Sequence, residues 1–136
     1  MNWKNNKVLI TGGASFIGSH LTEQLVELGA NVRIADNFSS GEKSYVKSLD
    51  CEILEGDLLN PGFCNQVTDG IETVFHLAAD HGGRGYIDAH QVECSTNMIL
   101  DGQVFRHAHR NGVEKIVFAS SGCVYPTSAQ MDVTQE

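Results

Sequence analysis

The fold of this chain is decided by the stretch Lys7-Val-Leu-Ile-Thr-Gly-Gly-Ala-Ser-Phe-Ile-Gly-Ser-His20. Its apolar start predicts a short buried strand, and Gly12, Ser15 and Gly18 follow at three-residue spacing. Leucines then repeat at helical spacing, namely Leu21, Leu25 and Leu28. A glycine-rich turn between a strand and a helix predicts a dinucleotide site, although such a turn can also bind nothing. The turn would bring backbone N–H groups and the positive end of a helix to a pyrophosphate.

Length, charge and cysteine content exclude several classes of protein. The 136 residues suffice for one domain with a substantial core. The net charge is −8 without any basic run, so we expect neither nucleic acid nor an anionic membrane surface as a partner. No stretch approaches a membrane span, and residues 1–10 hold no signal-peptide core. The scattered cysteines predict free thiols in a reducing cytoplasm and no metal site: Cys51, Cys64, Cys94 and Cys123.

Apolar runs alternate with helical patterns along the chain. The predicted strands are 8–10, 32–35, 51–54, 74–78 and 115–119. The predicted helices are 16–28, 61–67 and a long one over 88–110, and residues 39–48 form a polar connector. Buried strands separated by helices indicate a parallel sheet that is covered on both faces. Right-handed crossovers then predict an α/β, Rossmann-type doubly wound sheet with the strand order 3-2-1-4-5.

Helix-ending and helix-starting residues agree with this organisation. Gly29 and Asn111-Gly112 stand where the first and last helices should stop, and Asn60-Pro61 places a cap before a first-turn proline. The strand-to-helix loops then share one edge of the sheet, where ligands of open α/β sheets bind. These loops are 11–18, 36–41, 56–60, 78–87 and 120–126.

Residues of the first three loops have distinct predicted roles. Gly12 permits the tight turn and Gly18 the close packing of helix on strand, whereas Ser15 stands where a third glycine would approach the pyrophosphate. The Ser15 hydroxyl either donates to phosphate or crowds the ligand. Asp36 ends the second strand, where a carboxylate accepts from ribose hydroxyls and repels a 2′-phosphate, which favours NAD over NADP. Asp57 can accept from the adenine amino group. The alternatives are an ordinary turn or cap residue for Asp36 and an N-cap of the helix near Pro61 for Asp57.

The last two loops carry the candidate substrate contacts. His76 lies inside an apolar strand, which favours a core histidine with satisfied nitrogens. The following segment is Asp80-His-Gly-Gly-Arg-Gly85. It predicts a flexible loop that binds a diphosphate or a sugar, and the alternative is a solvated loop without a ligand. In Ala119-Ser-Ser-Gly-Cys-Val-Tyr125, a serine can bond a reacting hydroxyl, and the cysteine is either an acid/base or a buried thiol. Near the end of the last helix, His107 and His109 are predicted to lie on the surface.

Together these motifs resemble the N-terminal part of the extended short-chain dehydrogenases/reductases, the nucleotide-sugar epimerases and dehydratases. The matching segments are Thr11-Gly-Gly-Ala-Ser-Phe-Ile-Gly18, Asp36-Asn-Phe-Ser-Ser-Gly41, Gly56-Asp-Leu58, His76-Leu-Ala-Ala79, Asn97 and Ser120-Ser-Gly-Cys-Val-Tyr125. The resemblance implies that residues 1–136 form one NAD-binding Rossmann domain. It implies as cofactor-binding residues Gly12, Ser15, Phe16, Ile17, Gly18, Asp36, Asn37, Ser39, Asp57, Leu58, Leu77, Ala78, Ala79 and Asn97.

The resemblance also implies a reaction and its residues. Ser121 falls at the catalytic serine of a family that moves a hydride transiently from a sugar to NAD. Two segments, residues 78–86 and 120–126, look like the GDP-mannose 3,5-epimerase branch. In that branch Cys123 would be an acid/base and the glycine loop would touch a nucleotide-diphosphate sugar. That loop contributes Gly82, Gly83 and Arg84. A UDP-hexose 4-epimerase, the UDP-glucose 4-epimerase branch, is the close alternative and would leave Cys123 idle.

One part of the family pattern is missing from the sequence. The family's base is the tyrosine of a Tyr-x-x-x-Lys pair, and Tyr45, Tyr86 and Tyr125 have no lysine four residues later. Relative to the family, the domain is truncated before its later strands and its C-terminal substrate domain. We therefore expect cofactor binding without turnover and self-association through the uncovered edge of strand 115–119. The alternatives are a non-catalytic NAD-binding module and half of a site that another chain completes.

Overall fold

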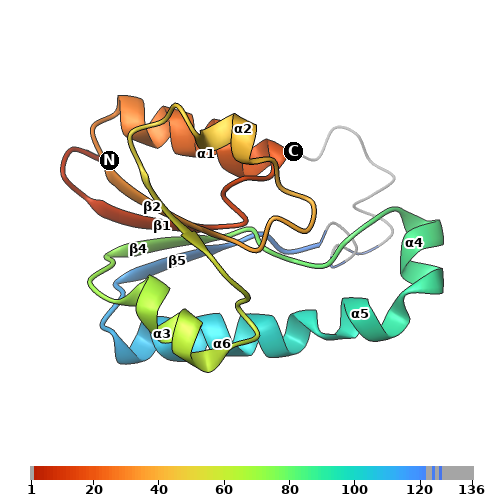
Figure 1. Cartoon of the computed structure of the whole chain (residues 1–136). Coiled ribbons are helices and arrows are strands. Elements are labelled where there is room, and N and C mark those ends of the chain that lie inside the picture. The colour runs from red at the N-terminus through yellow and green to blue at the C-terminus, as the bar shows by residue number, and fades with distance from the viewer. Residues whose placement is uncertain (1, 122–123, 125, 127–136) are drawn as a thin grey trace.

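The computed structural model describes residues 2–121, 124 and 126. Five parallel strands form one sheet in the order β3-β2-β1-β4-β5, which confirms the predicted doubly wound topology (Figure 1). The strands are β1 (Lys7–Thr11), β2 (Asn31–Asp36), β3 (Glu52–Glu55), β4 (Thr73–His76) and β5 (Lys115–Phe118).

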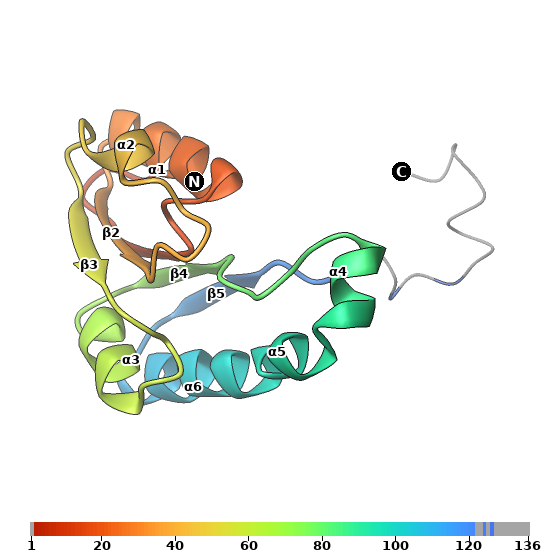
Figure 2. The same ribbon diagram turned by 45° about the vertical axis from the view of Figure 1, so that its right-hand side comes forward.

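Helices cover both faces of the sheet. The helices are α1 (Phe16–Glu27), α2 (Lys43–Val46), α3 (Pro61–Thr68), α4 (Arg84–Ala89), α5 (Gln91–Ser95) and α6 (Asn97–Arg110). Helices α1 and α2 lie on one face, and α3 and α6 lie side by side on the other (Figure 2). None of the helices within the described part of the chain is long and apolar enough to cross a membrane.

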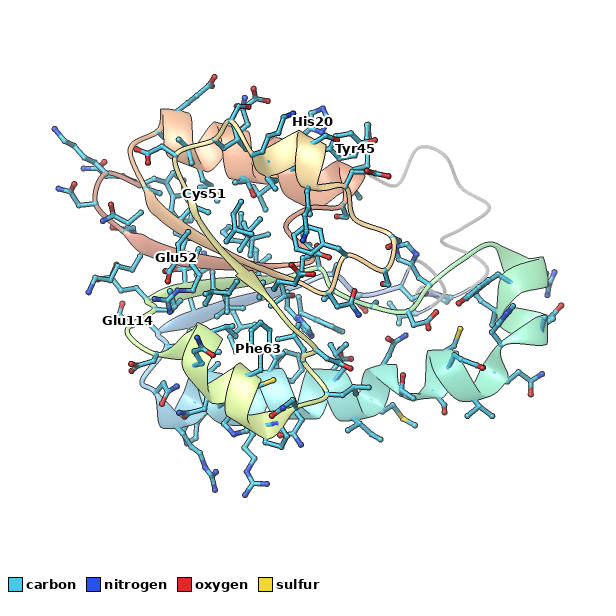
Figure 3. All side chains as sticks on the ribbon, in the orientation of Figure 1. His20, Tyr45, Cys51, Glu52, Phe63 and Glu114 are labelled. Atoms are coloured by element: carbon cyan, nitrogen blue, oxygen red, sulfur yellow. The ribbon has the colours of Figure 1, made fainter. Side chains whose placement is uncertain are left out.

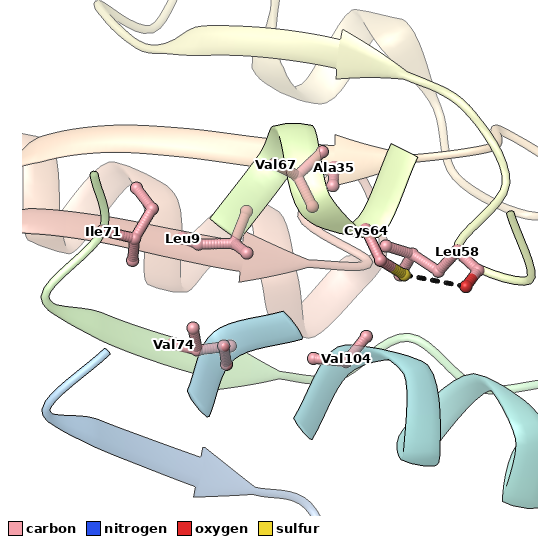
Figure 4. Close-up of a cluster of buried hydrophobic side chains, with 9 residues drawn as sticks. Leu9, Ala35, Leu58, Cys64, Val67, Ile71, Val74 and Val104 are labelled. Atoms are coloured by element: carbon pink, nitrogen blue, oxygen red, sulfur yellow. Dashed lines mark hydrogen bonds between the residues drawn. The ribbon is translucent and has the colours of Figure 1, made fainter. Parts of the chain in front are cut away.

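The central strand β1 is buried on both faces. Successive side chains of a strand point to opposite sides, so Val8 and Ile10 pack with the α1 layer while Leu9 packs with α3 and α6. All three side chains have no exposed surface. Figure 4 shows the second of these layers, in which Leu9 and Val74 of the sheet face Val104 and their neighbours.

Local capping sets the helix ends where the sequence predicted them. The Asn60 side chain accepts from the N–H groups of Gly62 (2.8 Å) and Phe63 (3.4 Å), ahead of Pro61 at the first position of α3. Gly29 and Gly112 adopt φ values of +82° and +74° after α1 and α6, a conformation that glycine enters at little cost.

The segment after β4 differs from its prediction. The loop expected over 78–87 becomes helix α4 at Arg84, and the long helix expected from residue 88 is divided into α5 and α6. The chain leaves the helical conformation at His90 (φ −128°, ψ 44°). Further on, the hydroxyls of Ser95 and Thr96 bond carbonyls three residues earlier, at 2.6 Å each. Such side-chain bonds compete with a continuous helix.

Two smaller predictions also need correction. One turn of helix, α2, lies within the connector predicted over 39–48. His107 is only 7% exposed, because it shares the inner face of α6 with Val104 and Ala108 at helical spacing. Its Nδ1 lies 2.8 Å from the carbonyl of Gln103, whereas His109 is exposed as predicted.

Strand β5 leaves an edge whose self-association can be tested. The N–H groups of Lys115 and Ala119 donate toward β4, to the carbonyls of Glu72 and His76. By alternation, the N–H groups of Ile116 and Phe118 point away from the sheet and form a template for another strand. We expect the chain to self-associate with rising concentration in light scattering.

Two variants at one position test that expectation. Ile116→Pro removes an outward donor without removing a bond to β4, and Ile116→Ala loses the same side chain while it keeps the donor. Self-association should weaken only in the proline variant. Equal behaviour of the two variants, or a monomer at every concentration, would contradict pairing through this edge.

Candidate dinucleotide site at the carboxyl edge of the sheet

A cavity of about 480 Å³ opens where β1, β2, β3 and β4 end. Most of the predicted cofactor-binding residues line it, namely Gly12, Ser15, Asp36, Asn37, Ser39, Asp57, Leu58, Leu77, Ala78, Ala79 and Asn97. Gly18 is buried behind the turn, and the predicted substrate loop at 82–84 is exposed and contributes no lining residue. Tyr86, which the sequence analysis did not select, also lines the cavity.

Three glycines shape the turn above β1. Gly12 adopts φ +69°, and a Cβ there would lie 3.0 Å from the backbone nitrogen of Ala78. A Cβ on Gly18 would lie 2.1 Å from the carbonyl oxygen of Gly12, so only glycine lets α1 pack this closely. Gly13 is equally constrained, because a Cβ would lie 2.5 Å from the side chain of Ile34. The sequence analysis missed this third position, which depends on a residue of the neighbouring strand.

Ser15 caps the helix that follows the turn. Its Oγ accepts from the N–H of Gly18 at 3.1 Å, and its carbonyl accepts from Ser19 at 2.8 Å. The first-turn N–H groups of Phe16 and Ile17 have no carbonyl of their own helix to bond. These donors at the positive end of α1 suit an anion, and the capping oxygen leaves the Ser15 hydroxyl proton available for a phosphate.

Phe16 and Ile17 are not among the residues that line this cavity. Their side chains are 73% and 67% exposed, and at the turn they offer their backbone N–H groups. Phe16 instead packs on His20, with ring centroids 4.8 Å apart, and borders a second cavity of about 320 Å³ between α1 and α2. His20 and Tyr45 lie at this second cavity (Figure 3).

Asp36 is held by two backbone donors at the end of β2. Its Oδ2 accepts from Ala14 N–H at 2.9 Å, and its Oδ1 accepts from Phe38 N–H at 2.8 Å. The side chain borders the cavity and is only 8% exposed. A carboxylate has about four acceptor sites, so two remain for ribose hydroxyls. Gly41 packs against it, because a Cβ there would lie 3.0 Å from Oδ1.

Asp57 and Leu58 differ in exposure. Asp57 is exposed and its Oδ1 accepts from Leu59 N–H at 2.8 Å, whereas the N-cap of α3, its alternative role in the sequence, belongs to Asn60. Leu58 is 4% exposed and belongs to the core, although it also lines the cavity. The Cys64 thiol donates to the Leu58 carbonyl at 2.9 Å (Figure 4). Burial, with a smaller contribution from Asp57, raises the pKa of this thiol to about 11, so it is unreactive.

The end of β4 is tied to β1 and α6 through His76. The Thr11 Oγ1 lies 2.6 Å from His76 Nδ1, and His76 Nε2 lies 3.0 Å from Asp101 Oδ1. The ring has both nitrogens paired and is 1% exposed, which confirms the predicted core histidine. Burial lowers the pKa of His76, and the hydrogen bond and charge of Asp101 oppose that effect.

Asn97 and Tyr86 hold the loop after β4. The Asn97 amide donates to the Asp80 carbonyl at 2.8 Å and accepts from the Asp80 N–H at 2.7 Å. The Tyr86 hydroxyl donates to Asp80 Oδ1 at 2.8 Å, and its ring stacks on His90 at 4.1 Å. A Cβ on Gly82 would lie 2.5 Å from the Tyr86 ring. Gly82 therefore makes room for Tyr86, a purpose that sequence spacing alone did not reveal.

The predicted catalytic segment is only partly described. Ser121 is exposed beyond β5, and its carbonyl accepts from Val124 N–H at 3.2 Å. Cys123 and Tyr125 lie outside the described residues. Among the residues that the structure does describe, no group of three or more histidine, cysteine, aspartate or glutamate side chains could hold a metal ion.

Comparison with known proteins places this site in a family. A model of the NAD dependent epimerase/dehydratase family matches residues 8–136. The chain belongs to that family. It is 35% identical over 132 residues to GDP-mannose 3,5-epimerase of Arabidopsis thaliana, across 96% of this chain. It spans only 35% of the length of that enzyme.

Solved epimerases have the same fold as this family member. UDP-N-acetylglucosamine 4-epimerase from Methanobrevibacter ruminantium M1, in complex with UDP-N-acetylmuramic acid, has a TM-score of 0.83 at 29% identity, over 96% of this chain and 42% of its own. UDP-glucose-4-epimerase from Stenotrophomonas maltophila, with bound NAD and formylated UDP-arabinopyranose, has a TM-score of 0.80 at 25% identity, over 89% and 38%. The family resemblance predicted from the sequence is confirmed.

The contact between Gly18 and Gly12 yields a stability prediction. Gly18→Ala should destabilise the domain by about 1–3 kcal/mol, because the added methyl overlaps a backbone carbonyl. Gly102 in α6 has open space around its Cβ position, and Gly102→Ala should stabilise by about 1 kcal/mol through helix propensity. Urea unfolding measures both, and equal stabilities of the two variants would refute the close approach.

The Tyr86–Asp80 bond yields a titration prediction. The hydrogen bond to Asp80, with smaller contributions from burial and nearby acidic groups, raises the pKa of Tyr86. Asp80→Ala should therefore lower the pH at which Tyr86 ionises, measured by absorbance against Tyr86→Phe as the baseline. Asp88→Ala removes an acid from the same helix and should leave the curve unchanged. A wild-type curve that coincides with Asp80→Ala would show that the bond does not form.

Proposed function

We propose that this chain is the NAD-binding part of a nucleotide-sugar epimerase or dehydratase. The observation that carries the proposal is the cavity between the capped N-terminus of α1 and the Asp36 carboxylate. When bound, NAD supplies a hydride acceptor for the sugar. The N–H groups of Phe16 and Ile17 would hold the pyrophosphate, and Ser15 would add a hydroxyl donor.

The remaining cavity residues divide the rest of the cofactor among them. Asp36, Asn37 and Ser39 would surround the adenosine ribose, and Asp57 and Leu58 would contact adenine. Leu77, Ala78, Ala79 and Asn97 would border the nicotinamide side, where small side chains permit close approach to the backbone. The anionic pyrophosphate thus meets N–H donors, while the carboxylates meet hydroxyl and amino donors.

Substrate binding is proposed for the exposed end of the same edge. The relatives are named as GDP- and UDP-sugar enzymes, and the ligands of the solved structures are UDP-sugars. A nucleotide-diphosphate sugar therefore suits the loop of Gly82, Gly83 and Arg84, where backbone donors and a guanidinium are exposed. Ser121 would hydrogen-bond the reacting hydroxyl. In the GDP-mannose 3,5-epimerase reading, Cys123 would serve as acid or base.

Turnover is expected to need groups that the 136 residues do not contain. The sequence has no Tyr-x-x-x-Lys pair, so no phenol with a depressed pKa is supplied as the base. We propose that these residues bind the cofactor and that catalysis requires a further segment. Epimerase activity after a segment with Tyr-x-x-x-Lys is added in trans would support a completed site. Cofactor binding that never leads to turnover in this mixture would favour a binding module.

A reducing cytoplasm is the proposed location. Cys51, Cys64 and Cys94 are free thiols, and cysteines that stay unpaired are typical of that compartment. Burial, with the nearby Asp50 charge, raises the pKa of the Cys51 thiol.

Cofactor preference provides the test of the proposed function. Calorimetry should show saturable one-site binding of NAD and much weaker binding of NADP, because the Asp36 charge repels a 2′-phosphate. Asp36→Asn should cost about 1.5–3 kcal/mol of NAD binding and narrow the gap to NADP. The amide oxygen still accepts one of the two backbone N–H groups, so the loop keeps a partner.

The control variant removes one negative charge, as Asp36→Asn does, at a position away from the cavity. Asp50 is exposed and lies just before β3, at the opposite edge of the sheet. Asp50→Asn should leave both affinities unchanged. The proposed function fails if the wild-type chain does not bind NAD, and the role of Asp36 fails if Asp36→Asn binds NAD as the wild type does.

A further inference from the structure

A buried chain of hydrogen bonds runs under the cavity wall. The Thr11 hydroxyl at the end of β1 accepts from the N–H groups of Leu77 (3.1 Å) and Ala78 (3.2 Å). The same oxygen lies 2.6 Å from His76 Nδ1, and His76 Nε2 lies 3.0 Å from Asp101 on α6. Strands β1 and β4 and helix α6 therefore meet at one imidazole ring.

The number of available protons favours one arrangement of donors and acceptors in this series of hydrogen bonds. A hydroxyl oxygen has two acceptor sites and one proton. Ala78 and Leu77 both donate to the Thr11 hydroxyl oxygen, and Leu77 shares its N–H with the Thr11 carbonyl at 3.2 Å. These contacts favour donation of the Thr11 proton to His76 Nδ1. The ring proton then lies on Nε2, where it is donated to Asp101. These contacts favour a neutral imidazole with its proton on Nε2, because the Asp101 carboxylate can only accept.

A protonated ring would not fit these contacts. With a proton on Nδ1, Thr11 would have to accept a third hydrogen bond or release a backbone N–H. Water cannot reach the ring nitrogens, because the His76 side chain has no exposed surface. The rings of Phe105 and Phe118 pack against it at 5.6 and 5.8 Å. Burial accordingly lowers the pKa of His76 despite the Asp101 charge.

The partners of His76 form or adjoin the cavity wall. Leu77 and Ala78 line the cavity, and Gly12 packs directly on the Ala78 backbone. On α6, Asn97 and Leu100 line the cavity next to Asp101. Within the described chain, the groups that face the ring are Thr11 from β1, Asp101 and Phe105 from α6, and Phe118 from β5. Asp101 is the charged group among these four.

We propose that His76 is a positioning residue of the dinucleotide site, which as the neutral Nε2–H tautomer locks the Leu77–Ala78 backbone against the glycine turn and α6. The proposal rests on the proposed function, because the locked backbone is the wall proposed to border the nicotinamide. The proposal also predicts that cofactor affinity is sensitive to acid through His76. In a protonated ring, Nδ1–H would compete with the Leu77 and Ala78 amides for the Thr11 oxygen, so cofactor affinity is full above the pKa of the ring and falls as the pH drops through it.

Ring-nitrogen NMR of the full chain tests the tautomer directly. In ¹⁵N-labelled wild-type protein at neutral pH, His76 should show an unprotonated Nδ1 and a protonated Nε2. A proton on Nδ1, or a doubly protonated ring at neutral pH, would overturn the proposal. This measurement needs neither a variant nor a cofactor.

Matched variants test the positioning role. Thr11→Val removes the hydroxyl at nearly constant volume, and Thr11→Ser keeps it. Hydrogen exchange of the Ala78 amide is the cleaner readout, because the Leu77 N–H also has the Thr11 carbonyl as an acceptor at 3.2 Å. Ala78 exchange should accelerate about tenfold in Thr11→Val and return toward wild type in Thr11→Ser. Unchanged exchange in Thr11→Val would contradict the lock.

The pH profile of NAD affinity separates positioning from general stability. Wild-type affinity should decline only at acidic pH, because burial lowers the pKa of His76 from its usual value, and His76→Phe should bind about tenfold more weakly at neutral pH without that decline. An identical pH profile in His76→Phe would overturn the acid sensitivity. Absence of NAD binding by the wild type would refute the proposed function, whereas the nitrogen and amide measurements decide the role of His76 by themselves.

Discussion

The close contact between the first turn of α1 and the glycine turn is the constraint on which the rest of this structure depends. Gly18 packs on the Gly12 carbonyl, and Gly12 packs on the backbone of Ala78. No side chain separates β1, β4 and α1 at this point. The positive end of α1 therefore lies directly above the parallel strand ends, and the cavity forms beside it.

Hydrogen bonds to buried side chains hold the neighbouring loops to this turn. The Asp36 carboxylate joins Ala14 in the turn to Phe38 in the loop after β2. Thr11 and His76 do the same for the end of β4, and Asn97 for the loop beyond it. Asp36, Thr11 and Asn97 bond backbone N–H or carbonyl groups of these loops, and His76 links Thr11 to Asp101. A backbone polar group that is buried without a partner costs free energy. The groups proposed to bind ligand are thereby set in place before a ligand arrives.

The negative charge of the chain is compatible with an anionic cofactor, because the carboxylates and the donors suited to a pyrophosphate lie at different places in the cavity. The chain carries a net charge of −8, and Asp36, Asp57 and Asp80 all line the cavity. The donors suited to a pyrophosphate are backbone N–H groups at the start of α1, which bear no net charge and act over a short range. Affinity at this site would therefore depend on local geometry and not on the overall field.

Sequence alone determined the strand order, the parallel topology, the glycine turn and the helices α1 and α3, because these follow from short-range signals. Hydrophobic period, a proline after Asn60 and glycines at positive φ act within a few residues, and crossover handedness then limits the strand order. The cavity-lining positions at the strand ends followed from that order. The break at His90 and the burial of His107 did not, because they depend on how the segment after β4 packs.

Only the tertiary structure decided which side chains meet. Thr11 and His76 are 65 residues apart in the chain, His76 and Asp101 are 25 apart, and Asp80 and Asn97 are 17 apart. No local pattern encodes the pairing of His76 with Thr11 and Asp101 or the packing of the Tyr86 ring over Gly82. Those features arise because a parallel sheet brings the ends of distant strands to one edge, where the remaining donors and acceptors must pair with whatever lies opposite.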